Sequence, residues 1–524
     1  MLLDRPIARE RARESEVALA LERGVPLLAA AVTLLLHALG NPHYGFFRDE
    51  LYFIICGRHP AIGYVDQPPV VPLLSAFSQA FGISLFALRI IPAFFAAFSV
   101  YVAARLALEL GGGVFAQIVA AMVTLFSPEL ITAGMRFSPD TLQVWLWPLI
   151  ALYVLRIAKG LDARWWLWVG FLTGLAGMAK YSVAFFIFAL IAGLLLTPQR
   201  RIMANRWFAG GVLIALAIMS PNIWWQVAHG LPMLQLLRND YGKYLMEWPP
   251  LPIQQIIVMS PLLSIVWIVG LVYFFKRREL HWLGWTYVIL MGVMTALKAK
   301  NYYPAPVYPI LIAAGALPIE SWAAKRPAWK TAVPALILLF AIPSLPFVMP
   351  VLPLRQEVAY QQFVTRAGNI KFHVMHVNSS ATPIQYFADM TGWPQLTQTV
   401  ANIYNDLPGA DRTQAAIFTS NFGEASAIDL YGKAYGLPPA LSGNNNYWIW
   451  GPRGYTGNVM IDVNGDLKTD LKRFKYAKIV TVFHNQYAMP YEDNLPIILC
   501  RGIKTPLPEL WPKLKDYSYA FKEL

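Results

Sequence analysis

Two adjacent carboxylates, Asp49 and Glu50, stand in the run FFRDELYF at residues 46–53. An ionised carboxylate can take the proton of a hydroxyl group, so either side chain could act as a general base. A simpler interpretation is that both acids lie in the first turn of a helix, where they stabilise the positive end of its dipole. Both interpretations stay open on this motif alone.

Three later motifs carry charged side chains of both signs. Arg136 and Asp140 occur in RFSPD, Lys180 in GMAKYS, and Lys300 in LKAKNYYP. Ammonium and guanidinium groups bind phosphate oxygens through charge-assisted hydrogen bonds. Cations of this kind, combined with a carboxylate base, suit the transfer of a group from a lipid phosphate to a hydroxyl acceptor.

The composition is typical of a membrane protein. Of the 524 residues, 56% are hydrophobic and only 14% are charged, whereas a soluble domain usually has about 25% charged residues. The net charge of +13 could suggest nucleic acid, but the basic residues flank apolar runs, as in KRRE at 276–279 and AAKRPAWK at 323–330. This positive-inside pattern predicts a bilayer partner and no nucleic acid.

Apolar runs that could cross a bilayer, or nearly so, recur up to residue 350. They predict about eleven transmembrane helices, at residues 25–40, 84–108, 113–131, 141–158, 164–179, 181–197, 206–223, 253–275, 281–297, 302–319 and 331–350. The charge rule places residues 1–24 in the cytoplasm and the region after residue 350 outside it. We therefore expect a multi-pass protein of the cell (inner) membrane.

Two outward loops and the C-terminal region are expected to carry structure of their own. Residues 41–83 and 224–252 mix aromatic, aliphatic and charged side chains, which is typical of helices that lie in the membrane interface. From about residue 355, strand-like runs such as KFHVMHVN, QAAIFTSN, NVMIDVN and AKIVTVFHN alternate with helical patterns. Residues 355–524 are therefore predicted to form a soluble, extracytoplasmic α/β domain with a mixed or parallel sheet.

The motifs also resemble a known family. FFRDELYFIICGRHPAIGYVDQPPVVPLLS, followed by RFSPD, GMAKYS and KNYYPAPVYP, resembles bacterial glycosyltransferases of the protein O-mannosyltransferase superfamily, whose relatives include the lipid A aminoarabinose transferases. The resemblance implies a GT-C transmembrane catalytic domain over residues 25–350. It also implies an inverting glycosyltransferase that moves a sugar from a polyprenyl-phosphate donor to a hydroxyl of an envelope glycolipid, polysaccharide or protein on the outer face of the membrane.

This resemblance implies roles for particular residues. Asp49 would be the base, with Glu50 and Asp140 beside it in the catalytic set. The expected donor phosphate-binding residues are Lys180, Arg136 and Lys300. Further substrate contacts are expected from Tyr64, Asp66, Gln67, Asn301, Tyr302 and Tyr303.

The C-terminal region resembles that of many bacterial members of the family through FTSNFGEASAIDLYGKAYGLP and SGNNNYWIWGP. Aromatic rings among amide side chains can stack on a sugar and hydrogen-bond to it, so this region could select the acceptor. The candidate acceptor-binding residues are Asn421, Glu424, Asn444, Tyr447 and Trp450. The simpler interpretation is that they belong to surface loops that close the α/β domain.

No cofactor is expected. A divalent ion could take hard oxygen ligands from Asp49, Glu50 and Asp140, but the nearer relatives imply no metal. The rival hypothesis is a non-enzymatic transporter or flippase of lipid-linked sugars, which would also explain the spans and the basic residues. The acids gather in outer loops and not at the bilayer midplane, which favours the enzyme.

Overall fold

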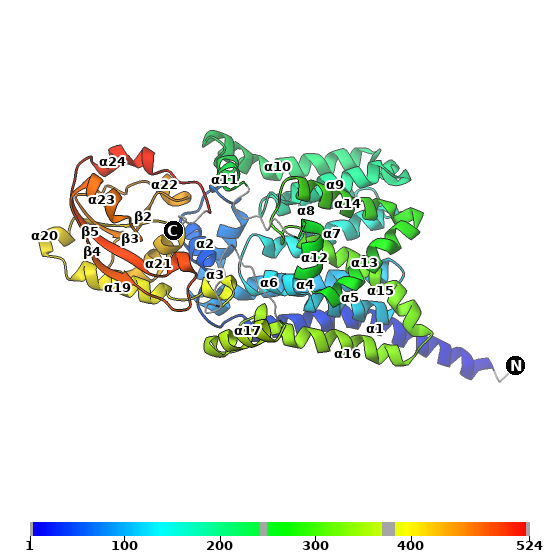
Figure 1. The fold of residues 1–524 in the computed structure, drawn as a ribbon. Helices are drawn as coiled ribbons and strands as arrows, with labels where there is room; N and C mark the ends of the chain where they lie inside the picture. Colours follow the sequence, from blue (N-terminus) through cyan, green and yellow to red (C-terminus); the bar gives the residue numbers. More distant parts are fainter. Residues whose placement is uncertain (1–3, 242–248, 369–382, 520–524) are drawn as a thin grey trace. The chain divides into compact units, whose positions relative to one another are not determined.

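The computed structural model of the chain describes residues 4–241, 249–368 and 383–519 (Figure 1). The chain divides into two compact units. The helical unit comprises Met1–Pro42, Phe86–Pro221 and Leu245–Val351, and the mixed unit comprises His43–Leu85, Asn222–Tyr244 and Leu352–Leu524. The two predicted interfacial loops therefore pack for the most part with the C-terminal region, although the sequence assigned them to the transmembrane domain.

Six helical segments in the described residues are long and apolar enough to cross a membrane. They are Ala20–Gly40 of α1 (Asp4–Gly40), α4 (Leu85–Glu109), α7 (Asp140–Ala158), α10 (Arg206–Ala228), Ala305–Ala324 (η3, Ala305–Val307, and α15, Tyr308–Ala324) and Ala328–Phe347 (α16, Ala328–Ser344, and η4, Leu345–Phe347). A seventh span arises if α5 (Val114–Phe126) and α6 (Pro128–Met135), bent by 63°, count as one. The membrane class is confirmed, and the number of about eleven spans stays a prediction.

Several predicted spans are shorter helices than the apolar runs suggested. Helices α8 (Trp165–Gly177), α9 (Val183–Leu195) and α13 (Pro261–Lys276) are apolar but have fewer than 18 residues. The run 253–275 is divided into α12 (Leu251–Val258) and α13 because Ser260 adopts a φ of 69° and Pro261 begins a new helix. The remaining helical segments of this unit are η1 (Pro198–Met203), η2 (Arg278–Leu280) and α14 (His281–Ala296).

Glycines allow close helix crossings in the helical unit. Helix α15 packs against both α13 and α5 (Figure 1). A Cβ atom on Gly270 would overlap the carbonyl of Leu311, and one on Gly315 would overlap the carbonyl of Val266. Small residues at such crossings let two helix backbones approach closely, which is how helices associate inside a bilayer without a hydrophobic driving force.

The mixed unit contains a five-stranded sheet in the order β2-β1-β3-β5-β4. Its strands are β1 (Ala415–Thr419), β2 (Leu441–Ser442), β3 (Val459–Val463), β4 (Phe474–Phe483) and β5 (Leu495–Ile503). Strand β1 runs parallel to β2 and β3, whereas β5 is antiparallel to β3 and β4, so the sheet is mixed. The strands predicted from QAAIFTSN, NVMIDVN and AKIVTVFHN are confirmed, β2 and β5 were missed, and KFHVMHVN lies outside the described residues.

The centre of this sheet is covered on both faces, whereas the edge strand β4 is mostly exposed. Every residue of β3 is buried, as expected for a strand with a layer on each side. On one face, Met460, Ile498 and Cys500 pack with Leu507 and Trp511, and helix α19 (Trp393–Asn405) also contacts β3 and β4. The other segments of this unit are α2 (Arg48–Arg58), α3 (Val70–Gln79), α11 (Pro232–Asp240), α17 (Leu354–Gly368), α18 (Gln385–Ala388), α20 (Gly409–Arg412), α21 (Phe422–Tyr431), η5 (Gly432–Tyr435), α22 (Asn446–Trp450), α23 (Leu467–Arg473), η6 (Pro490–Glu492), α24 (Leu507–Leu510) and η7 (Trp511–Leu514).

Candidate functional site

Lys180 and Asp140 form an ion pair in the helical unit. Asp140 is the first residue of α7, and Lys180 lies in the turn that joins α8 to α9. The distance from Lys180 Nζ to Asp140 Oδ1 is 2.6 Å, and each side chain is 17% exposed. Because water screens this pair only in part, its two charges interact more strongly than those of an exposed pair.

The rings of Tyr302 and Tyr303 complete this cluster. The Lys180 Nζ atom lies 5.2 Å from the centroid of the Tyr302 ring and 4.3 Å from that of the Tyr303 ring. The negative face of an aromatic ring stabilises a cation at such distances. The motifs RFSPD, GMAKYS and KNYYPAPVYP therefore contribute side chains to one cluster, which we call the Lys180 cluster: Asp140, Lys180, Tyr302 and Tyr303.

The other predicted site residues of this unit, two for the donor phosphate (Arg136 and Lys300) and one for the substrate (Asn301), lie in the same segments. Arg136 follows α6 and is buried, and Lys300 and Asn301 stand immediately before Tyr302 in the turn after α14. The Asn301 carbonyl accepts a hydrogen bond of 2.9 Å from Gln255 Nε2, which ties this turn to α12.

Glu129 was not predicted from the sequence. It lies in the first turn of α6 and interacts electrostatically with Arg136, Asp140 and Lys180. One feature of the sequence could have revealed it, since a single acid inside the apolar run 113–131 is expensive to place in a membrane unless it has a partner or a function.

The acidic pair lies at the start of α2 in the mixed unit. Glu50 is fully buried, and its Oε2 atom accepts a hydrogen bond of 2.8 Å from the backbone N–H of Phe47, the residue that precedes the helix. Glu50 thus satisfies a helix-terminal N–H group, as the third residue of a helix often does. The Asp49 side chain is 33% exposed, and Asp49 Oδ1 lies 3.5 Å from Arg48 Nε. Asp49 is therefore the member of the pair that a substrate can reach.

Asp66 lies in a network of tyrosine hydroxyls. Tyr52 Oη donates to Asp66 Oδ1 at 3.1 Å, and Tyr519 Oη donates to Asp66 Oδ2 at 3.4 Å. Burial raises the pKa of Asp66 to about 7, although the Tyr52 hydrogen bond works in the opposite direction. A carboxyl group with this pKa exchanges its proton near neutral pH, so Asp66 can take part in acid–base chemistry as well as in binding.

The two neighbours of Asp66 that were expected to bind substrate differ in their surroundings. The Tyr64 hydroxyl donates toward the carbonyls of Cys56 and His59 and accepts from the Ala61 N–H, so Tyr64 holds the loop after α2. Gln67 is buried, and its side-chain amide has no hydrogen-bond partner within the part of the chain that the structure describes. The hydrogen bonds of Tyr64 thus give it a structural role, whereas no hydrogen bond explains the buried amide of Gln67.

Four of the five candidate acceptor-binding residues are engaged inside the mixed unit. Asn421 caps α21 by accepting from the N–H groups of Gly423 and Glu424. Glu424 is fully buried and accepts a hydrogen bond from the Ser420 N–H.

The other two of these residues belong to the NNNYWIW stretch. Asn444 Nδ2 donates to the carbonyls of Asp516 and Ser518, and Tyr447 Oη donates to Asp429 Oδ2 at 3.0 Å. This geometry favours a structural role for these four side chains.

Trp450 is the partly exposed member of that set. Its ring centroid lies 4.4 Å from that of His59 and 4.7 Å from that of Tyr447. The Arg453 guanidinium lies 5.9 Å from the Trp450 ring. An aromatic ring with a cation beside it can hold a sugar. Acceptor binding by Trp450 therefore stays a prediction.

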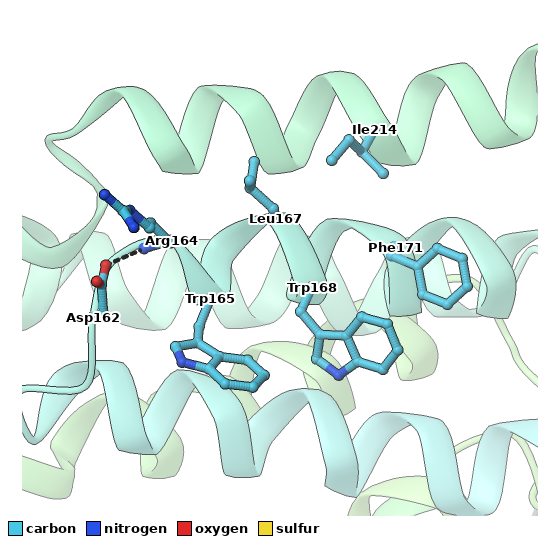
Figure 2. Close-up of a pocket in the computed structure, with 7 residues that line it drawn as sticks. All are labelled: Asp162, Arg164, Trp165, Leu167, Trp168, Phe171 and Ile214. Atoms are coloured by element: carbon cyan, nitrogen blue, oxygen red, sulfur yellow. Dashed lines mark hydrogen bonds between the residues drawn. The ribbon is translucent and has the colours of Figure 1, made fainter.

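A groove of about 480 Å³ lies in the helical unit, and none of the residues that line it is a predicted site residue (Figure 2). It is lined by Asp162, Arg164, Trp165, Leu167, Trp168, Phe171 and Ile214. Its walls are mostly apolar and aromatic, with Asp162 and Arg164 as the charged exceptions, so most of the groove suits a hydrocarbon chain. Within residues 4–241, 249–368 and 383–519, no group of three or more His, Cys, Asp or Glu side chains could hold a metal ion.

Comparison with known sequences gives two relationships. The family described as dolichyl-phosphate-mannose-protein mannosyltransferase matches residues 66–225. The lipid A galacturonosyltransferase RgtD of Rhizobium johnstonii is 25% identical over 192 residues, which make up 35% of this chain and 39% of RgtD. The alignment thus spans less than half of the length of this curated relative.

Solved structures show the fold. ArnT from Cupriavidus metallidurans bound to undecaprenyl phosphate superposes with a TM-score of 0.60 at 13% identity, over 90% of this chain and 97% of ArnT. The apo state of the same protein gives a TM-score of 0.58 over 93% of this chain and 98% of ArnT. At this identity the likeness concerns the fold. Together with the sequence matches, it confirms the resemblance to GT-C glycosyltransferases related to lipid A-modifying enzymes.

Proposed function

Since the chain is related by sequence and fold to GT-C glycosyltransferases of the protein O-mannosyltransferase type, we propose that it transfers a sugar from a polyprenyl-phosphate donor to a hydroxyl of an envelope acceptor. The acceptor would be a glycolipid, a polysaccharide or a protein on the outer face of the membrane. The observation that carries this proposal is the Lys180 cluster, in which a largely buried cation lies at the ends of helices. A protein of similar fold, ArnT, has been solved with bound undecaprenyl phosphate.

Lys180 is the proposed ligand of the donor phosphate. An ammonium group has three N–H donors, and Asp140 takes one of them at 2.6 Å. Among the described residues only Asp140 accepts a hydrogen bond from this ammonium group, so its other N–H groups can bind the oxygens of a phosphate diester, and the adjacent Tyr302 and Tyr303 rings attract its positive charge. Asp140 therefore acts in this proposal as the residue that holds Lys180 in place.

Asp49 is the proposed general base. Its carboxylate is the exposed one of the acidic pair, and it would take the proton of the acceptor hydroxyl while the oxygen attacks the anomeric carbon. The bond from that carbon to the phosphate oxygen breaks, and its electron pair leaves with the lipid phosphate. Attack opposite to the leaving group inverts the anomeric configuration. Because the phosphate leaves as an anion, no general acid is required.

The same proposal assigns roles to Asp66, to the membrane helices and to the C-terminal region. Asp66 lies in the loop after α2 and, with a pKa raised by burial to about 7, can accept a hydrogen bond from the acceptor or exchange a proton with it. The membrane helices are expected to hold the polyprenyl chain. Residues 355–524 are expected on the outer side, where Trp450 offers an aromatic surface for the acceptor.

The alternative is a flippase that moves a lipid-linked sugar across the bilayer without cleaving it. The matches by sequence, a mannosyltransferase family and a galacturonosyltransferase, do not favour it. A direct test is to incubate the purified full-length protein in nanodiscs with a polyprenyl-phosphate sugar and a mixture of envelope glycolipids. We expect release of polyprenyl phosphate from the wild type and from Lys330→Ala, an exposed lysine far from the Lys180 cluster in sequence, and loss of release in Asp49→Asn. Intact donor in all samples would exclude the transferase.

A further inference from the structure

Arg48, which precedes the proposed base, is fixed on several sides inside the mixed unit. Only 5% of the residue is exposed. Its backbone N–H donates to the carbonyl of Asp389 at 3.1 Å, and its guanidinium carbon lies 4.9 Å from the centroid of the Phe422 ring. Its Nε and Nη2 atoms both lie 3.5 Å from Asp49 Oδ1. A buried side chain with these contacts has little freedom to change its rotamer.

The titratable groups around Arg48 come from three segments. Asp49 is its neighbour in α2, Asp389 follows α18, and Tyr491 and Glu492 belong to η6. Burial raises the pKa of Asp389 to about 6 and that of Glu492 well above its usual value, although the positive charge of Arg48 favours the ionised form of both. Arg48 therefore compensates acids that would otherwise be buried near the site without a counterion.

Gly423 leaves the space that the Arg48 side chain fills. A Cβ atom at this position would overlap Arg48 Cγ and lie only 2.7 Å from Arg48 Cδ. Gly423 stands in the first turn of α21, which Asn421 caps, and no positive φ explains the glycine. Close approach of the arginine stem is thus the reason for the missing side chain. Phe422, next to it, supplies the ring beneath the guanidinium.

We propose that Arg48 is a positioning residue for Asp49, and that Gly423 and Phe422 of the C-terminal region hold it in place. The inference rests on the proposed function in so far as Asp49 is the base. It gives the C-terminal region a role in the chemical step, beyond acceptor selection. A segment about 370 residues away in sequence would then fix the carboxylate through the arginine between them, without itself touching the substrate.

The claim is tested by a double-mutant cycle that does not depend on turnover. Asp49→Cys places a thiol beside Arg48, and the pH dependence of its alkylation by iodoacetamide gives its pKa; Cys56 and Cys500 are buried and react slowly. A neighbouring cation lowers a thiol pKa. We expect Gly423→Ala to raise this thiol pKa by about one unit, since displacing one nearby charge typically has an effect of that size. Gly409→Ala should leave it unchanged, because nothing lies within 4 Å of its added Cβ atom.

The second side of the cycle separates positioning from general disruption of α21. With Arg48→Ala in place, the clash is gone, so Gly423→Ala should cause no further change in the thiol pKa. Should Gly423→Ala not fold, Phe422→Leu removes the ring beneath the guanidinium and is expected to raise the thiol pKa in the same direction. An unchanged thiol pKa, or equal effects with and without Arg48, would overturn the inference.

Turnover gives an independent readout in the chain that keeps Asp49. Gly423→Ala should lower kcat for release of polyprenyl phosphate about tenfold, with little change in the KM of the donor, because a misplaced base slows the chemical step. A wild-type protein that releases no lipid phosphate would refute the proposed function, and the thiol measurement would still decide whether Gly423 acts through Arg48. A loss confined to KM would contradict positioning of the base.

Discussion

Replacing Lys180 by alanine tests the binding of the donor phosphate. The Lys180–Asp140 pair, at 2.6 Å and 17% exposure, has a gross Coulomb energy of about 6 kcal/mol at an effective dielectric constant of about 20. Most of this is offset by desolvation, and a hydrogen bond to a charged group contributes about 1.5–3 kcal/mol net. If the phosphate uses the free donors of Lys180, Lys180→Ala should weaken donor binding by about tenfold to a hundredfold.

The same substitution leaves Asp140 without its cation, so stability must be measured beside affinity. Donor binding is measured by titrating a fluorescent polyprenyl phosphate into the protein in nanodiscs, and stability by thermal unfolding in detergent. Asp140→Asn combined with Lys180→Ala should recover the stability lost in Lys180→Ala, since it removes the lone shielded charge, but should not recover donor affinity. Lys330→Ala is the control for an exposed lysine. An unchanged donor titration in Lys180→Ala, or recovery of affinity in the double variant, would refute the assignment.

Three further outcomes are expected. Asp49→Asn should lower transfer by about 10²–10⁴-fold at unchanged donor affinity, and activity within a few-fold of wild type would remove Asp49 from the mechanism. Burial raises the pKa of Asp66 and of Glu424 to about 7, so the folded state binds their protons more tightly than the unfolded state does. Proton binding therefore adds to the free energy of unfolding. This contribution is fully present below about pH 4 and is lost as the pH rises through 7. The melting temperature should therefore fall between pH 5 and pH 8, and it should fall less steeply in Asp66→Asn. A steeper fall in that variant would contradict the assignment of this pH dependence to Asp66. Ala410→Cys, an exposed position in the C-terminal region, should react with a membrane-impermeant maleimide in intact spheroplasts, and labelling only after lysis would overturn the predicted topology; Ser442, in the same region, is fully buried and unsuitable.

The membrane class and the sheet strands could be predicted because each depends on local patterns. Long apolar runs predicted both ends of α4 and α7 closely and the start of α10, which continues beyond the predicted end to Ala228, and alternating apolar residues predicted β1, β3 and β4. The breaks at Ser127 and Ser260 were missed, because a proline after a serine inside an apolar run changes its hydropathy little while it ends the helix.

The site could be predicted only in part, for a physical reason. Charged residues in apolar surroundings, such as Asp49 and Lys180, stand out in the sequence because their burial requires a partner. Which partner they find depends on contacts between distant segments, and no local pattern pairs Lys180 with Asp140 or places Phe422 under Arg48. The capping role of Glu50 was hidden as well, because Phe47 at the N-cap lacks the hydroxyl, amide or carboxylate side chain that usually marks such a pair in a sequence.

The most direct test of the account is the fate of a polyprenyl-phosphate sugar with an isotopically labelled anomeric carbon. The purified protein in nanodiscs is supplied with this donor and with envelope acceptors, and the products are separated and examined by NMR and mass spectrometry. We predict free polyprenyl phosphate together with an acceptor that carries the label in the opposite anomeric configuration. Retained configuration would contradict direct displacement with Asp49 as base, and intact donor moved to the opposite leaflet would contradict the enzyme itself.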